Sequence, residues 1–371
     1  MTRLWSVLAV SLVIALIIDF RDKNYTLAGS KKKDVFFTFL LCVILSFFCG
    51  LRTWGNDTVT YREIYDYLTP DLTGFFAGEM PDFADGIGFI FVNSLLKTFQ
   101  LTFQDTLVVY AFLTVVPYVY FVRRYSGSMV FGVFLMFTTG FYTFALAAIK
   151  QCMATALCLL AVDAILHKKW IRYFVFIAMA MLFHPYSIVY ILVPIMMFRP
   201  WTKRTFIYMA IFVVIGFLLE DLLGIVLDIT DMIGADYDEL SFIGAGVNIF
   251  RVFVAFVPLM LATVGGRKTF EYSTTTDNLM FNLAMLNALF MFVGLFGTAN
   301  YFARLANYFL PGQIIAIPFL IKRWKPEVRL FFVVTCVVGY LGYFVYENAI
   351  IRPFDYGYPQ MNFFDYISSI I

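Results

Sequence analysis

Long apolar runs alternate with short polar stretches along almost the whole chain. A membrane-spanning helix needs about 20 mainly apolar residues, with about 17 at the short end of the range. Ten stretches fit this pattern or its lower edge and predict membrane-spanning helices: 4–19, 35–50, 106–122, 129–147, 151–166, 205–219, 246–265, 278–298, 302–321 and 328–346. We expect 4–19 to be a retained helix, because no small-residue cleavage signal follows it.

A further apolar block, 170–198, is interrupted by Phe183-His184-Pro185-Tyr186-Ser187. Proline disfavours helical geometry at the residue before it. The block therefore predicts a broken hairpin of two short helices that enter and leave on the same side of the membrane.

The composition agrees with a protein that uses the bilayer as its solvent. The chain has 371 residues, of which 61% are hydrophobic and only 14% charged, so one soluble core cannot bury its apolar surface. We expect an all-α, polytopic membrane protein with a single transmembrane domain over 1–371. Its polar parts are predicted at 51–105 (an outer loop with interfacial helices), 220–245 (an acidic outer loop) and 347–371 (an outer tail).

Cofactor motifs are not evident in the sequence. The five cysteines have no CxxC or histidine spacing, and two histidines do not predict a zinc site. Neither GxxxxGK[ST] nor GxGxxG occurs, so no nucleotide loop is predicted. We expect no cofactor, no metal and no nucleic-acid partner.

The basic residues concentrate in every second connection. Nineteen of the 27 lysines and arginines lie in the segments 21–34, 123–128, 167–172, 199–204, 265–277 and 322–329. The positive-inside rule predicts that all six face the cytoplasm. Successive spans place these six segments on the same side of the membrane only if 170–198 returns to the side where it starts. Both ends of the chain are then expected outside.

Eight basic residues remain for the outer side, and four of them lie close to the outer ends of apolar helices: Arg52, Lys150, Arg251 and Arg304. A single cation at this level can simply extend to lipid headgroups. Four on different helices, against the positive-inside trend, favour an anion-binding cup. The planar guanidinium suits phosphate or pyrophosphate.

Candidate acid–base groups lie near this cup. Asp57 follows Arg52 in a Gly-Asn-Asp turn and can act as a base or as the N-cap of a helix starting near Thr58. His184 lies in the helix break, where it can take part in chemistry or simply bond a freed carbonyl. Tyr61 and Tyr65, one helix face apart, can stack on sugar rings. We assign no role to Asp163, which lies inside an apolar helix.

Five short motifs together resemble those of the EpsG/Wzy-type bacterial polysaccharide polymerases. They are Gly50-Leu51-Arg52 with Gly55-Asn56-Asp57 and Tyr61, Gly86-Ile87-Gly88-Phe89 with Asn93, Lys150-Gln151 with Ala154, Phe183-His184 with Ser187, and Arg304 with Tyr308-Phe309. The resemblance covers about residues 35–320. Lys150 stands where the family pattern has Arg, and Gly86 stands where it has Glu, with Asp85 one residue earlier.

The resemblance implies a GT-C-like architecture and a glycosyltransferase that polymerises undecaprenyl-pyrophosphate-linked repeat units at the outer face of the bacterial plasma (inner) membrane. It implies pyrophosphate binding by Arg52, Lys150, Arg251 and Arg304, and sugar contacts from Tyr61, Tyr65, Gln151 and Tyr308. Asp57 is the first choice for the general base, with His184 and Asp85 as runners-up. The expected partners are the lipid-linked oligosaccharide, membrane lipids, a chain-length regulator and a flippase.

Three other functions remain open at this point. An O-antigen ligase would share the donor and the side of the membrane but use another acceptor. A flippase or transporter of lipid-linked sugars would perform no chemistry and is expected to show internal repeats. A membrane O-acyltransferase would need a second essential histidine or an Arg-rich cytoplasmic entry, and neither is evident.

Overall fold

The computed structural model describes residues 1–27, 33–70, 72–78, 86–218, 246–296 and 299–357, with isolated positions at 225, 228, 229 and 232. This part of the chain is helical and contains no strand. Its elements are α1 (Thr2–Leu27), α2 (Phe36–Gly50), α3 (Thr58–Tyr67), α4 (Thr73–Ala77), α5 (Ile87–Thr98), α6 (Phe103–Tyr125), α7 (Met129–Thr138), α8 (Phe141–Phe144), α9 (Ile149–Leu166), α10 (Trp170–Phe183), η1 (Pro185–Met196), α11 (Lys203–Phe217), α13 (Ile249–Gly265), η3 (Gly266–Phe270), α14 (Thr275–Val293), α15 (Ala299–Lys322), α16 (Pro326–Val345) and η4 (Tyr346–Ile351). Most of the predicted acidic loop 220–245 and the end of the tail, 358–371, lie outside the described residues.

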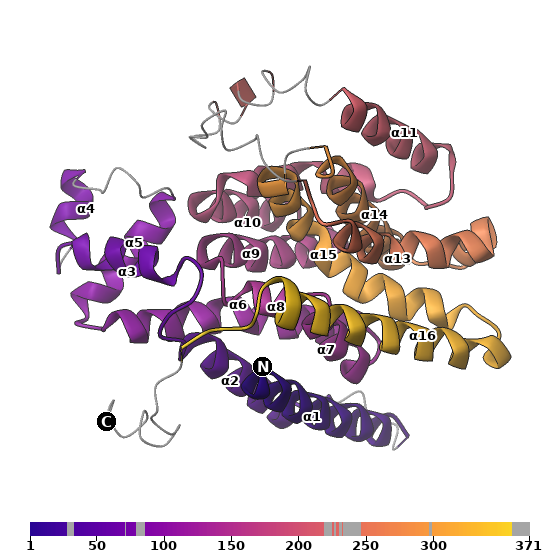
Figure 1. Ribbon diagram of the computed structural model, residues 1–371, viewed down its shortest axis with the longest axis horizontal. Helices are drawn as coiled ribbons and strands as arrows, with labels where there is room; N and C mark the ends of the chain where they lie inside the picture. The colour runs from indigo at the N-terminus through magenta and orange to yellow at the C-terminus, as the bar shows by residue number, and fades with distance from the viewer. Residues whose placement is uncertain are drawn as a thin grey trace.

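The long helices lie side by side in one bundle, and α3, α4 and α5 gather at one end of it (Figure 1). Seven of the described helical segments are long and apolar enough to cross a membrane: α1, α6, α9, α13 with η3, α14, α15, and α16 with η4. The molecule is therefore an α-helical membrane protein, as the sequence predicts. Helices α9, α14 and α15 are mostly buried within the bundle.

The predicted continuous span 129–147 is wrong, because the helix stops halfway. Helix α7 ends at Thr138, and Gly140 follows with φ +84°, a left-handed conformation that favours glycine. The hydroxyls of Thr138 and Thr139 bond to carbonyls one turn back, at Phe134 and Leu135. The chain then makes the short helix α8 before α9 begins.

The broken hairpin at 170–198 is present. Helix α10 ends at Phe183, His184 is extended with φ −154° and ψ 110°, and η1 starts at Pro185. The Tyr173 hydroxyl of α10 donates to the carbonyl of Tyr190 in η1, so the two arms lie against each other.

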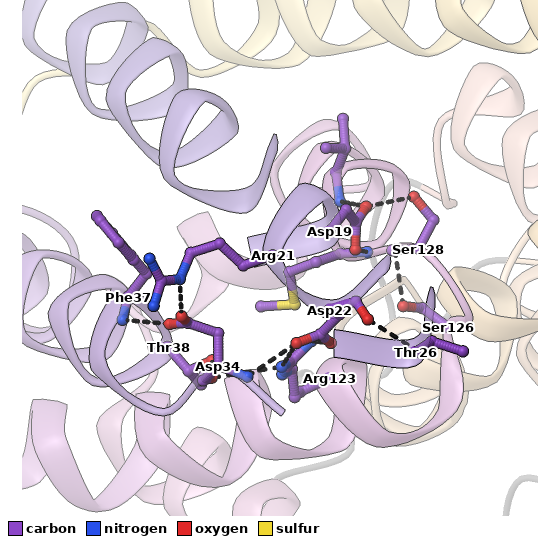
Figure 2. Close-up of polar contacts among 12 residues, drawn as sticks. Asp19, Arg21, Asp22, Thr26, Asp34, Phe37, Thr38, Arg123, Ser126 and Ser128 are labelled. Atoms are coloured by element: carbon purple, nitrogen blue, oxygen red, sulfur yellow. Dashed lines mark hydrogen bonds and ion pairs between the residues drawn. The ribbon is translucent and has the colours of Figure 1, made fainter. Parts of the chain in front are cut away.

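The basic segments meet at one end of the bundle. Figure 2 shows Arg123, at the end of α6, beside the Asp22 carboxylate of α1, with 2.5 Å between Nη1 and Oδ2. Arg21 pairs with Asp34 just before α2. The Asp19 carboxylate accepts bonds from the Ser128 hydroxyl and from the first backbone N–H groups of α7. Charge-assisted hydrogen bonds therefore join α1 to α6, to α7 and to the segment before α2.

The other basic segments connect to the same end. The Arg124 Nε lies 2.8 Å from Asp163 Oδ1, which places Asp163 in an ion pair near the end of α9. Arg323 donates to the Tyr272 carbonyl at 2.7 Å, and Trp201 stacks on Phe270 with 6.4 Å between ring centroids. Arg124 also contacts His167 at 2.6 Å, and Gly127 lies beside the Lys322 ammonium, which connects the two groups of segments. All six basic segments therefore share one end, as the alternation of charge predicts.

Candidate functional site

A cavity of about 930 Å³ lies at the opposite end of the bundle. Its walls come from the start of α3, the turn between α7 and α9, the break at His184, the first turns of α13 and α15, and the end of α16 with the segment 352–356. This volume is at the upper end of the usual range for ligand pockets.

Four cations from different elements line the cavity: Lys150, Arg251, Arg304 and Arg352. Lys150 is the second residue of α9 and Arg251 the third of α13. A helix N-terminus carries partial positive charge, so a cation in the first turn is electrostatically unfavourable unless an anion is close. Three carboxylates, of Asp57, Glu347 and Asp355, line the same cavity.

Arg251 already has an anionic partner. Its Nε and Nη2 lie 2.8 and 2.6 Å from the two carboxylate oxygens of Glu347, in a bidentate pair that joins α13 to η4. Asn248 reinforces the junction through the Tyr346 hydroxyl at 2.8 Å. Glu347 therefore neutralises the charge of Arg251 at the cavity wall.

Helix α15 is held by side-chain donors from three neighbouring elements. Gln151 of α9, Asn287 of α14 and Tyr190 of η1 donate to the carbonyls of residues 304, 306 and 308 at 2.6, 2.7 and 2.6 Å. These bonds fix the rotation and height of α15. They thereby direct Arg304 into the cavity.

His184 lines the cavity at the hairpin break, and one ring nitrogen is already engaged. Its Nδ1 lies 2.9 Å from the hydroxyl of Tyr308, whose side chain is fully buried. Gly86 closes the far side of the break with φ +86°, and a Cβ there would lie 2.7 Å from the Phe183 carbonyl oxygen. A carboxylate side chain at position 86 would not fit, which explains why the chain has glycine there.

Asp57 and Tyr61 lie at the mouth of the cavity. Asp57 occupies the N-cap position of α3, yet its carboxylate makes no capping bond, so the capping alternative is not realised. Burial, with the nearby charge of Asp57, raises the pKa of Tyr61, and its phenol stays neutral. The exposed carboxylate of Asp57 is thus available to a substrate.

Three predicted site residues lie behind the cavity wall. Arg52 is 1% exposed and bonds to the Cys49 carbonyl at 2.6 Å and the Thr58 hydroxyl at 3.3 Å. Tyr65 donates to the Leu101 carbonyl, and Tyr308 supports His184. None of the three lines the cavity, because each side chain is turned into the packed interior.

Arg52 nevertheless acts on the cavity through its charge. It has no ion-pair partner in the described part of the chain, and it lies close enough to Tyr61 and Tyr356 for its charge to affect both. Asp85, the other runner-up for the base, falls outside the described residues.

The segment 352–357 forms one wall that the sequence did not reveal. It runs from the end of α16 to the start of α3 (Figure 1). Asn56 Nδ2 donates to the Tyr356 hydroxyl at 2.6 Å, and the Thr53 N–H donates to the Gly357 carbonyl at 2.6 Å. Burial raises the pKa of Tyr356 to about 12, so the phenol stays protonated.

Two buried amides at the inner part of the cavity were also missed. The Nε2 of Gln313 donates to the Val254 carbonyl at 2.7 Å, and Asn287 donates to α15. Their carbonyl oxygens, Asn287 Oδ1 and Gln313 Oε1, have no hydrogen-bond partner among the described residues. Both residues line the cavity, and both oxygens are themselves buried within its wall. Only their polarity within apolar helices could have marked them.

Fold and site together define a polytopic membrane protein with a large cavity at one end, lined by four cations and three carboxylates. Within the described ranges, no group of three or more His, Cys, Asp or Glu residues is placed to hold a metal.

The chain matches the EpsG family over residues 35–368, which is most of its length, and it belongs to that family. Membership points to a polysaccharide-polymerase type of role. No curated protein and no solved structure matches the chain.

Proposed function

We propose that this protein is a glycosyltransferase that extends a bacterial polysaccharide from lipid-pyrophosphate-linked repeat units at the outer face of the plasma membrane. The observation that carries the proposal is the cavity in which Lys150, Arg304 and Arg352 converge from three elements, at the end opposite the basic segments. A GT-C-like architecture remains a prediction.

The donor is a growing glycan on undecaprenyl pyrophosphate, and the acceptor is a hydroxyl of the next lipid-linked repeat unit. Asp57 takes the proton of that hydroxyl as its oxygen attacks the anomeric carbon of the donor. The bond from that carbon to the pyrophosphate oxygen breaks, and the electron pair leaves with the lipid pyrophosphate. Lys150 and Arg304 stabilise the developing negative charge because they are fixed in place before the reaction.

The remaining walls suit a polar glycan. Asn287 and Gln313 add polar groups to the wall, and the Tyr61 side chain, which is 5% exposed, lies at the edge of the cavity near the sugar. Gln151 acts indirectly, since its amide nitrogen is bonded to the Arg304 carbonyl. Arg52 supplies positive potential from behind the wall.

The test is incubation of the purified protein with a synthetic lipid-pyrophosphate oligosaccharide, followed by separation of the products by size. We expect a ladder that grows by whole repeat units. A single transfer to a different lipid acceptor would identify a ligase. Movement of the substrate across a vesicle without new bonds would identify a flippase.

The proposed reaction, and not the cavity, calls for partners beside the enzyme. A flippase must deliver the repeat unit to the outer face, and a chain-length regulator is the second candidate partner. Reconstitution of the protein alone should still give a ladder, with a broader length distribution than in the presence of a regulator.

A further inference from the structure

Three tyrosines and His184 form a row of hydrogen bonds that ends at the cavity, in which the first two bonds are accepted by backbone carbonyls. The Tyr173 hydroxyl donates to the carbonyl of Tyr190, the Tyr190 hydroxyl donates to the carbonyl of Tyr308 at 2.6 Å, and the Tyr308 hydroxyl contacts His184 Nδ1 at 2.9 Å. All three tyrosine side chains are fully buried. The row therefore connects the hairpin to α15 and fixes the imidazole at the break.

The direction of the last hydrogen bond follows from what each group can do. The Tyr308 hydroxyl has His184 Nδ1 as its one partner in the described part of the chain. If the imidazole donated to it, the phenol hydrogen would be buried without an acceptor, which costs about 1–3 kcal/mol. An unprotonated imidazole nitrogen is also a better acceptor than a phenol oxygen. Tyr308 therefore donates to Nδ1.

The hydrogen of the neutral ring must then be on Nε2, since a neutral imidazole carries one. Because Nδ1 is turned toward buried Tyr308, Nε2 is the nitrogen on the cavity side. It has no partner among the described residues. Lys150 and Arg304 are close enough for their charges to act on the ring, so a second ring proton would add a third positive charge to the group.

We propose that Tyr308 is a positioning residue that holds His184 in the tautomer with hydrogen on Nε2, so that His184 gives the anionic part of the substrate a neutral hydrogen-bond donor. His184 then works with Lys150 and Arg304 on the leaving group and does not act as the base. The anion-binding half of this proposal rests on the proposed function, whereas the tautomer does not.

The tautomer can be read directly, because the chain has two histidines. In protein labelled with ¹⁵N-histidine, the His167→Gln substitution leaves His184 as the single imidazole signal. We expect a hydrogen attached to Nε2 and a bare Nδ1 with the chemical shift of a hydrogen-bonded acceptor. A hydrogen on Nδ1, or on both nitrogens, overturns the proposal.

Tyr308→Phe removes the donor and should move the Nδ1 resonance toward that of an unbonded nitrogen. Tyr173→Phe is the matched control, because it also removes one buried hydroxyl from the row but does not touch His184. An unchanged Nδ1 resonance in Tyr308→Phe, or an equal change in Tyr173→Phe, would show that Tyr308 does not position the ring.

Two substitutions of His184, by glutamine and by glutamate, distinguish a hydrogen-bond donor from a general base at this position. Glutamine places an N–H near the position of Nε2, whereas glutamate of the same length offers only acceptors and a negative charge. If His184 donates, His184→Gln should retain at least about tenfold more polymerisation than His184→Glu. The reverse order would identify a base. Absence of any ladder from the wild type would refute the proposed function and leave the ¹⁵N result standing.

Discussion

At the scale of single residues, the cavity is defined by cations that occupy unfavourable positions. Lys150 and Arg251 lie in first helical turns, where the backbone already carries positive charge, and Glu347 compensates Arg251. Lys150 and Arg304 both act on His184. The proposed function assigns these groups to the pyrophosphate of the substrate.

Arg304→Ala should lower the rate of chain extension by about 100-fold or more, because it removes a preorganised donor to the leaving pyrophosphate. Arg304→Lys should restore part of the rate, since it returns the charge without the planar fork. The measurement is the initial rate of ladder formation. Arg62→Ala is the control, because Arg62 lies on α3 against Phe103 and does not line the cavity. Equal losses in the two alanine variants would contradict the assignment.

Asp57→Asn should reduce turnover by about 100-fold or more while substrate binding is retained, as expected when a general base is removed. Asp355, the other exposed carboxylate that lines the cavity, provides the comparison. If Asp355→Asn is the slower variant, the base lies on the C-terminal segment. Rates and binding should be measured separately to distinguish the two steps.

At the scale of elements, the site depends on helices that stop early and on a terminal segment that folds back. Helix α7 ends at Thr138, and the hairpin breaks at His184, so polar side chains enter a region that unbroken helices would fill with apolar ones. Backbone irregularity of this kind is tolerated within a membrane where it lines a cavity.

Gly55→Ala should displace the segment 352–357 from the cavity mouth. Gly55 has φ +115°, and a Cβ there would lie 2.4 Å from the Tyr356 ring. Gly78→Ala is a matched control, because Gly78 has φ +78° and no atom within 4 Å of an added Cβ. Limited proteolysis should cut the chain within the segment that follows Pro353 faster in Gly55→Ala than in the wild type or in Gly78→Ala. Polymerisation should fall in parallel. Equal cleavage in both variants would mean that backbone strain and not the ring contact is responsible.

Asp19 serves a structural purpose at the other end. Its carboxylate bonds the Ser128 hydroxyl and two N–H groups at the start of α7, which ties α1 to α7 (Figure 2). Asp19→Ala should destabilise the protein by about 1–3 kcal/mol, read as a lower thermal midpoint in detergent. Asp19→Asn should cost less, because it keeps one acceptor oxygen. Equal midpoints for all three proteins would show that the contact contributes nothing.

At the scale of the whole molecule, the two ends of the bundle differ in their polar residues. One end gathers six basic segments, and the other holds the cavity with its four cations. This division supports an orientation with the basic end in the cytoplasm.

Cysteine labelling can test this orientation, because all five native cysteines are buried and should not react. A membrane-impermeant maleimide should label Glu63→Cys in intact cells. Lys268→Cys should react only after the membrane is opened. The opposite pattern would place the cavity in the cytoplasm and exclude a reaction at the outer face.

The sequence by itself determined the helical class, most of the helices, the hairpin break and the end at which each basic segment lies. These properties follow from local sequence, since a run of apolar residues must be buried in lipid and a proline disfavours helical geometry at the residue before it. Seven predicted site residues do line the cavity: Asp57, Tyr61, Lys150, Gln151, His184, Arg251 and Arg304.

Only the tertiary structure decided which polar side chains face the cavity. The sequence favours Arg52 and not Arg352 as a site residue, yet Arg52 is packed behind the wall and Arg352 lines it. The difference depends on contacts such as that between Asn56 and Tyr356, which are 300 residues apart. A local pattern sets how a helix begins and ends, but the rotation of each helix and the path of the terminal segment are set by packing against distant parts of the chain.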